Sequence, residues 1–196
     1  MDNPIRSALT VSWATVTWST ATGLASVVLG ISAASLALVG SGASVLVDVS
    51  SSLVLIWRFR HPQGHEAAER RAHLFAATAL VVLAVLLALS SADRLATGGP
   101  AHPTVTTTLL ASASLVVLPL LAWRKYVVAR AVPSPALRTD AHLTSVGAST
   151  AGLALLGFAL TQEGAAWADP AAALVVALIA GTVGVVELRA RNGSGA

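Results

Sequence analysis

The stretch AHLFAATALVVLAVLLALSSA, residues 72–92, decides the fold class of this chain. It contains no Asp, Glu, Lys or Arg. About 20 mostly apolar residues in a helix are enough to cross a hydrocarbon core about 30 Å thick. Backbone groups cannot stay unpaired in lipid, so a segment that crosses must be a helix or a strand of a closed barrel. Because the stretch is long and shows no alternation of polar and apolar residues, we predict a transmembrane helix.

Similar apolar stretches lie on both sides of it, with short connections between them. The six predicted spans cover about 10–31, 34–57, 72–92, 104–123, 139–161 and 169–187. They predict one all-α domain over residues 1–190, a six-helix transmembrane bundle in contact with the lipid bilayer. A short tail, 191–196, is expected to follow, with no soluble C-terminal domain. The first span is too long for a cleavable signal peptide, and a second follows it almost at once.

Composition supports a membrane protein and excludes several functions. Only 11% of the residues are charged and 55% are hydrophobic, whereas soluble domains carry about 25% charged residues. The net charge is only +3, and the positive residues lie at the ends of apolar runs, so we expect no nucleic-acid partner. The absence of Cys excludes disulfides, thiolate metal sites and cysteine catalysis.

The positive charges predict the orientation, because Lys and Arg gather on the cytoplasmic side of membrane proteins. With both termini cytoplasmic, only Arg94 falls outside. Trp57, Trp123 and Trp167 lie at predicted membrane interfaces, where aromatic residues are common. We therefore predict a multi-pass protein of the cell membrane. The residues placed on the cytoplasmic side are Arg6, Arg58, Arg60, Arg70, Arg71, Arg124, Lys125, Arg130, Arg138, Arg189 and Arg191.

Asp48 is the acidic residue predicted to lie deepest in the membrane. It precedes Trp57 by nine residues, which at 1.5 Å per residue is roughly 14 Å of depth. A carboxylate near the bilayer centre costs about 2.5–3.5 kcal/mol on insertion scales, so we expect Asp48 to face the bundle interior. There it would bind a cation or a proton. Alternatively it is protonated and hydrogen-bonded to neighbouring serines: Ser44, Ser51 or Ser52.

Asp140 and His142 open the fifth predicted span. Asp140 lies about a turn inside the interface, so it is either a functional carboxylate or a residue that stabilises the helix N-terminus. His142 lies about 200° around the helix from Asp140, since each residue turns about 100°. One helix face therefore cannot present both side chains well.

The connection between the second and third spans contains His61 and His65, followed by Glu66 and Glu69. Imidazole and carboxylate groups suit divalent transition metals. A charged interfacial loop that is simply solvated explains the same residues.

Four segments resemble, in the same order, the membrane domain of the cation diffusion facilitator family. In that family S-x-A-L begins the second helix, with an acid thirteen positions after the serine. G-H-x-x-A-E lies between helices two and three, a further segment leads into the fifth helix, and D-P opens the sixth helix. The matching segments are Ser35-Leu36-Ala37-Leu38 with Asp48, Gly64-His65-x-x-Ala68-Glu69, Leu137-Arg138-Thr139-Asp140-Ala141, and Trp167-Ala168-Asp169-Pro170.

The resemblance implies a six-helix exporter of Zn²⁺ or a similar divalent cation, usually in exchange for protons. The family joins a D/H-x-x-x-D pair on helix two to another on helix five. Here those positions fall on Ser44 and Asp48, and on Leu143 and Gly147, so only one acid remains. Counted in from Arg138, Gly147 is predicted to lie level with Asp48.

The resemblance therefore predicts a transporter with a reduced metal site. Candidate metal residues are Asp48, Asp140, His142, His61 and His65, the last two matching positions that hold a secondary metal in some members. We expect no cofactor beside the transported cation, and carry a homodimer as a hypothesis. The alternative is a non-transporting scaffold or partner subunit with the same fold. An enzyme is not expected: Ser149 has no His at matching depth to activate it.

Overall fold

Six α-helices form the protein in a computed structural model that describes residues 4–60, 66–98, 101–131 and 135–192. Each is long and apolar enough to cross a membrane, which confirms the all-α six-helix fold. The helices extend past most predicted span ends, because a helix need not stop where the hydrocarbon core does. Their bounds are α1 Pro4–Ser32, α2 Leu36–Arg60, α3 Glu66–Thr97, α4 Val105–Ala131, α5 Pro135–Gln162 and α6 Ala168–Asn192.

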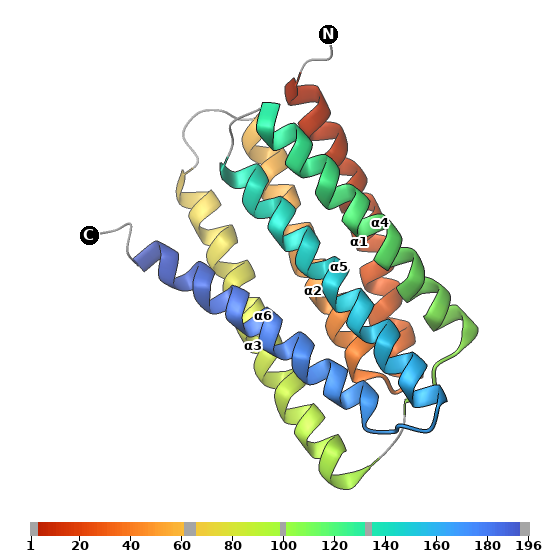
Figure 1. Cartoon of the computed structure of the whole chain (residues 1–196). Helices are drawn as coiled ribbons and strands as arrows, with labels where there is room; N and C mark the ends of the chain where they lie inside the picture. Colours follow the sequence, from red (N-terminus) through yellow and green to blue (C-terminus); the bar gives the residue numbers. More distant parts are fainter. Residues whose placement is uncertain (1–3, 61–65, 99–100, 132–134, 193–196) are drawn as a thin grey trace.

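The helices form two groups, and α2 and α5 of the first group also contact the second. α1, α2, α4 and α5 pack as four roughly aligned helices, and α3 packs lengthwise against α6 beside them (Figure 1). α2 contacts helices of both groups, and α5 contacts α6 as well as α2 and α4. Side chains on α2 and α5 can therefore meet inside the bundle.

Small residues let α1 and α2 approach closely. A Cβ added to Gly42 would lie 2.7 Å from the Cβ of Ser26 and 2.8 Å from the backbone oxygen of Gly23, so only glycine fits there. α1 also turns a stripe of small hydroxyl residues toward the interior, at helical spacing. This is the close packing typical of membrane helices. The stripe consists of Ser12, Thr15, Ser19, Thr22 and Ser26.

The tight turn predicted near Ser32 is present. α1 ends at Ser32 and α2 begins at Leu36. Between them Ala34 takes a φ of +52°, a left-handed conformation that closes the helix end. The Arg94 side chain donates a hydrogen bond to the Ala34 carbonyl oxygen. The arginine predicted to lie outside thus joins the end of α3 to this turn.

The orientation in the membrane stays a prediction, and reporter fusions can test it. Fusions after Leu95 or Glu163 are expected to report the outer side, and a fusion after Arg130 the cytoplasm, because positive residues accumulate at that end. Along the chain, the fusions after Leu95, Arg130 and Glu163 should therefore report the outside, the cytoplasm and the outside. A cytoplasmic signal from both Leu95 and Glu163 would reverse the predicted topology.

Candidate functional site

Lys125 lies in the bundle interior, and the sequence-based placement of it in the cytoplasm is wrong. α4 continues to Ala131, so Lys125 lies inside the helix, and its side chain is fully buried. Ten of the eleven residues predicted to lie on the cytoplasmic side keep that prediction. The pattern of α4 indicates that Lys125 is buried, because the buried residues of the helix repeat at steps of three and four and Lys125 falls in this series. The series is Thr107, Ala111, Ser114, Leu118, Ala122, Lys125 and Ala129.

The Lys125 ammonium group binds side chains of α2 and α5. Its Nζ lies 2.6 Å from Oδ2 of Asp140, in an ion pair whose two side chains are both fully buried. The same Nζ donates to Oγ1 of Thr144 at 2.7 Å and to Oγ of Ser52 at 3.1 Å. Ser52 in turn donates to Oδ1 of Asp140 at 2.8 Å. Both oxygens of the Asp140 carboxylate therefore have a partner.

Asp48 joins the same cluster through Thr144. It is buried, and its Oδ2 and Oδ1 lie 3.0 and 3.2 Å from the Thr144 hydroxyl. That oxygen also lies 3.0 Å from the Asp140 backbone oxygen, but its single hydrogen serves one acceptor at a time. Thr144 thus accepts from the ammonium and can donate to Asp48. We call Asp48, Ser52, Lys125, Asp140 and Thr144 the carboxylate cluster.

Helical spacing explains how this cluster forms. Asp48 and Ser52 are four residues apart on α2, and Asp140 and Thr144 are four apart on α5, so each pair lies on one helix face. When all three groups are ionised, two carboxylates face one ammonium and one negative charge is in excess. Asp140 pairs with the ammonium directly, and Asp48 reaches it through the Thr144 hydroxyl.

The alternative that Asp48 bonds to serines of its own helix is wrong, because its hydrogen-bond partner, Thr144, lies on α5. Ser44 instead bonds to the Ser41 carbonyl oxygen at 2.8 Å and to the Thr150 hydroxyl at 3.1 Å, and so belongs to a separate polar layer. The alternative of a helix-terminal role for Asp140 also fails. α5 begins at Pro135 and has no acidic residue in its first turn.

Residues 12–190 match the family model for the cation efflux transmembrane domain. The chain belongs to the cation efflux family. This is a family of cation transporters rather than enzymes, so the chain is an integral, multi-pass membrane protein of that class. A search of curated proteins found no match.

The family positions on helix five contribute no ligand here. Leu143 packs toward Leu80, Ala84 and Ala180 of the α3–α6 pair. A Cβ on Gly147 would lie 3.2 Å from Val45. Thr144, not Gly147, is therefore level with Asp48, so the predicted depth was wrong by about one turn. Counting in from loop charges assumes helices that start at one level, whereas α5 starts earlier at Pro135.

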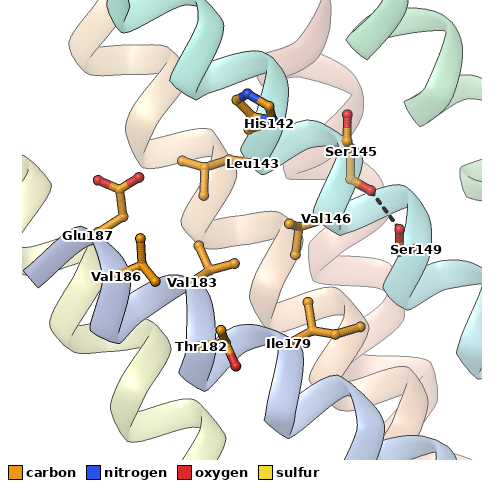
Figure 2. A pocket seen from close by; sticks show the side chains of 10 residues that line it. All are labelled: His142, Leu143, Ser145, Val146, Ser149, Ile179, Thr182, Val183, Val186 and Glu187. Carbon is orange, nitrogen blue, oxygen red and sulfur yellow. Dashed lines mark hydrogen bonds between the residues drawn. The ribbon is translucent and has the colours of Figure 1, made fainter. Parts of the chain in front are cut away.

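His142 lies away from the carboxylate cluster, as its predicted angle to Asp140 requires. It is exposed, and its Nδ1 lies 2.9 Å from the Tyr126 hydroxyl oxygen. It borders a cavity of about 570 Å³ between α5 and α6. Figure 2 shows Glu187 of α6 on the opposite wall, with Leu143 and other apolar side chains between them. No member of the carboxylate cluster lines this cavity.

Two of the predicted metal residues stay untested. His61 and His65 lie outside the described residues. Across the ranges that the structure describes, no group of three or more His, Cys, Asp or Glu side chains is placed to hold a metal ion. The candidate donors at the cluster are therefore two carboxylates and two hydroxyls.

Two of the family-like segments meet at the opposite end of the bundle. Asp169 is fully buried; its Oδ1 accepts from the Ser35 hydroxyl at 2.5 Å and its Oδ2 from the Leu36 backbone N–H at 2.8 Å. The Ser35 oxygen also accepts from the Leu38 N–H at 3.0 Å. Both residues thus cap the N-terminus of α2, which fixes α6 against the helix that carries Asp48.

Replacing Asp169 is expected to destabilise the fold. Asp169→Ala leaves the buried Ser35 hydroxyl and the Leu36 N–H without their acceptor, at a cost of about 1–3 kcal/mol for each unsatisfied group. Thermal unfolding in detergent should show a lower midpoint. Asp93→Ala, which alters an exposed side chain at the same end, is the control and should change little. Equal midpoints for both variants would exclude a capping role.

Proposed function

We propose that the protein moves a divalent cation out of the cytoplasm across the cell membrane, with Asp48 and Asp140 as the carboxylates that bind it. One observation carries this proposal. Two buried carboxylates, one from α2 and one from α5, lie in one cluster inside membrane-spanning helices. Ionisable groups in such segments mark ion pathways in many transporters. The chain belongs to a family of cation transporters, so the proposed substrate is a cation.

The donor atoms favour a cation that accepts oxygen ligands. Asp48, Asp140, Ser52 and Thr144 offer only carboxylate and hydroxyl oxygens. Oxygen donors suit Mn²⁺, Mg²⁺ and Ca²⁺. Zn²⁺, the cation that the resemblance implies, also accepts carboxylate oxygens, although its sites usually include nitrogen or sulfur. We therefore propose a divalent cation of this group, with Mn²⁺ and Zn²⁺ as the first two to compare.

Proton exchange follows from the same carboxylates. A carboxylate that releases a divalent cation can bind a proton in its place, so the site can return without leaving a bare negative charge in lipid. In this proposal one side of the membrane loads the cation and the other side loads protons. A pH gradient would then drive cation movement.

The cavity between α5 and α6 supplies a route for the cation to approach. His142, Leu143 and Glu187 line it (Figure 2), and Leu143 directly precedes Thr144 of the cluster along α5. A displacement of α6 relative to α5 would expose the cluster to this cavity. His142 then assists entry rather than binding the cation at the cluster, and His61 and His65 are proposed to raise the local cation concentration.

A second candidate function also has an observation in its favour. The ion pair between Lys125 and Asp140 neutralises a carboxylate that a cation would need. A partner subunit that keeps the family fold without transport would require only such an internally neutralised interior. A measurement of ion transport distinguishes the transporter from the partner subunit.

Ion flux in vesicles tests the proposed function and its ion choice. Purified protein in proteoliposomes should accelerate uptake of at least one ion among Mn²⁺, Zn²⁺, Mg²⁺ and Ca²⁺, and an opposing pH gradient should change the rate. Protein-free vesicles give the baseline. Flux that is fast but insensitive to the pH gradient would retain the transporter and remove the proton exchange.

A further inference from the structure

Lys125 places a positive charge where the proposed function requires a cation to bind. Its ammonium lies 2.6 Å from the Asp140 carboxylate and 2.7 Å from Thr144, whose oxygen is 3.0 Å from Asp48. It also uses the Ser52 hydroxyl, at 3.1 Å. These are the oxygen donors available to a divalent cation at the cluster. The ammonium and such a cation therefore compete for the same atoms.

We propose that Lys125 is a tethered counter-cation, which occupies the cation position in the described state and which the transported cation must displace. This inference rests on the proposed function for the identity of the competing ion. A lysine suits the role, since its ammonium is a compact point charge on a flexible four-carbon stem. The bound ammonium keeps the two carboxylates from facing each other unscreened while no transported ion is bound.

The position of Lys125 allows its ammonium to move away from the cluster toward the end of α4. α4 ends at Ala131, six residues farther along, which is about 9 Å at 1.5 Å per residue. A long lysine side chain near a helix end can extend its charge toward the interface while its stem stays in apolar surroundings. α4 packs chiefly against α1 and α5, and the side chains that α1 buries in the bundle are uncharged hydroxyl residues and alanine.

A purely structural ion pair would also bury Lys125 beside Asp140, but it makes a different prediction for cation binding. A structural pair only holds α4 against α5, so its loss lowers stability and creates no affinity for ions. A competitor lowers the apparent affinity of the site for any cation that uses the same oxygens. Removing the competitor should therefore raise that affinity.

Cation titrations of the full-length protein in detergent distinguish the two roles. The probes are Mn²⁺ and Zn²⁺, and binding is followed by calorimetry. Lys125→Gln should bind the preferred ion at least about tenfold more tightly than the wild type, which corresponds to about 1.4 kcal/mol. Adding Asp140→Asn to Lys125→Gln should abolish the gain, because the ion then loses a carboxylate ligand. A folded Lys125→Gln protein that binds no more tightly than the wild type overturns the inference.

Lys125→Arg keeps the experiment decisive if Lys125→Gln does not fold. The guanidinium preserves the charge and can form the pair with Asp140. Its fixed N–H donors can bind both oxygens of a carboxylate at once, so it resists displacement by a cation. It should therefore bind the ion more weakly than the wild type at similar thermal stability. Equal affinity of the arginine variant and the wild type overturns the inference.

The outcomes also separate this inference from the proposed function. Wild-type flux with unchanged affinity in both lysine variants removes the counter-cation and leaves the transporter. Ion binding that appears only in Lys125→Gln, with no wild-type flux, supports the counter-cation and removes transport. No binding by any folded variant overturns both.

Discussion

Asp140→Asn is expected to destabilise the protein by about 3–5 kcal/mol, because it removes the charged partner that the buried Lys125 ammonium contacts directly and leaves only Asp48, which reaches the ammonium through Thr144. Asparagine has nearly the same shape and can still accept from Ser52, so the lost charge is the main change. Denaturation in detergent, followed by circular dichroism, measures the loss. The exposed Glu163→Gln is the control, and its effect should lie within about 0.5 kcal/mol.

A second substitution should recover most of this stability. Asp140→Asn combined with Lys125→Met removes both charges, and neutral pairs of this kind are often as stable as the ion pair they replace. The pair is therefore coupled, and the double variant should be far more stable than the sum of the two single losses. A double variant as unstable as the sum would show that the two side chains act independently, against the geometry described here.

Asp48→Asn is expected to have the largest effect on transport and a small effect on stability. The amide keeps the size of the side chain, and its oxygen can still accept from the Thr144 hydroxyl. It cannot bind a cation as a carboxylate does or take up a proton. We expect a folded protein whose cation flux falls to the level of protein-free vesicles, with a melting temperature at or above that of the wild type.

Ser44→Ala is the matched control for Asp48→Asn. Ser44 lies one turn from Asp48 on α2 and occupies the first position of the family's helix-two pair, but its hydroxyl bonds to Thr150 and Ser41. Its loss should cost about 1 kcal/mol of stability through these hydrogen bonds and leave flux nearly intact. Loss of flux in Ser44→Ala with flux retained in Asp48→Asn would move the cation site to the Ser44 layer.

The fold was largely predictable from the sequence because span length is a property of the chain alone. Apolar stretches long enough to cross lipid can hardly form anything but helices there. The turn after Ser32 was also predicted, although its Ala34 conformation and the Arg94 contact were not. They depend on which loop meets which helix end, and this information is absent from any single segment.

The candidate site was predictable only in part, because it depends on helix rotation and on relative depth. Asp48 was correctly placed in the interior, but the residue of α5 at its level is Thr144 rather than the predicted Gly147. Lys125 was missed since it follows Trp123 and Arg124 and so resembles an interfacial charge. Its true direction follows from the buried repeat of α4, which runs through Leu118 and Ala122 to Lys125. Which partner it meets depends on how α4 and α5 pack.

Cation flux through the purified protein tests whether it transports a cation at Asp48. Vesicles containing the wild type, Asp48→Asn or no protein are loaded with an ion-sensitive dye and exposed to Mn²⁺ or Zn²⁺ under an imposed pH gradient. We expect uptake well above the protein-free rate in wild-type vesicles for at least one ion, and uptake at the protein-free rate for Asp48→Asn. Wild-type uptake that equals the protein-free rate for every ion, with the pH gradient in either direction, would contradict transport and leave the partner-subunit function.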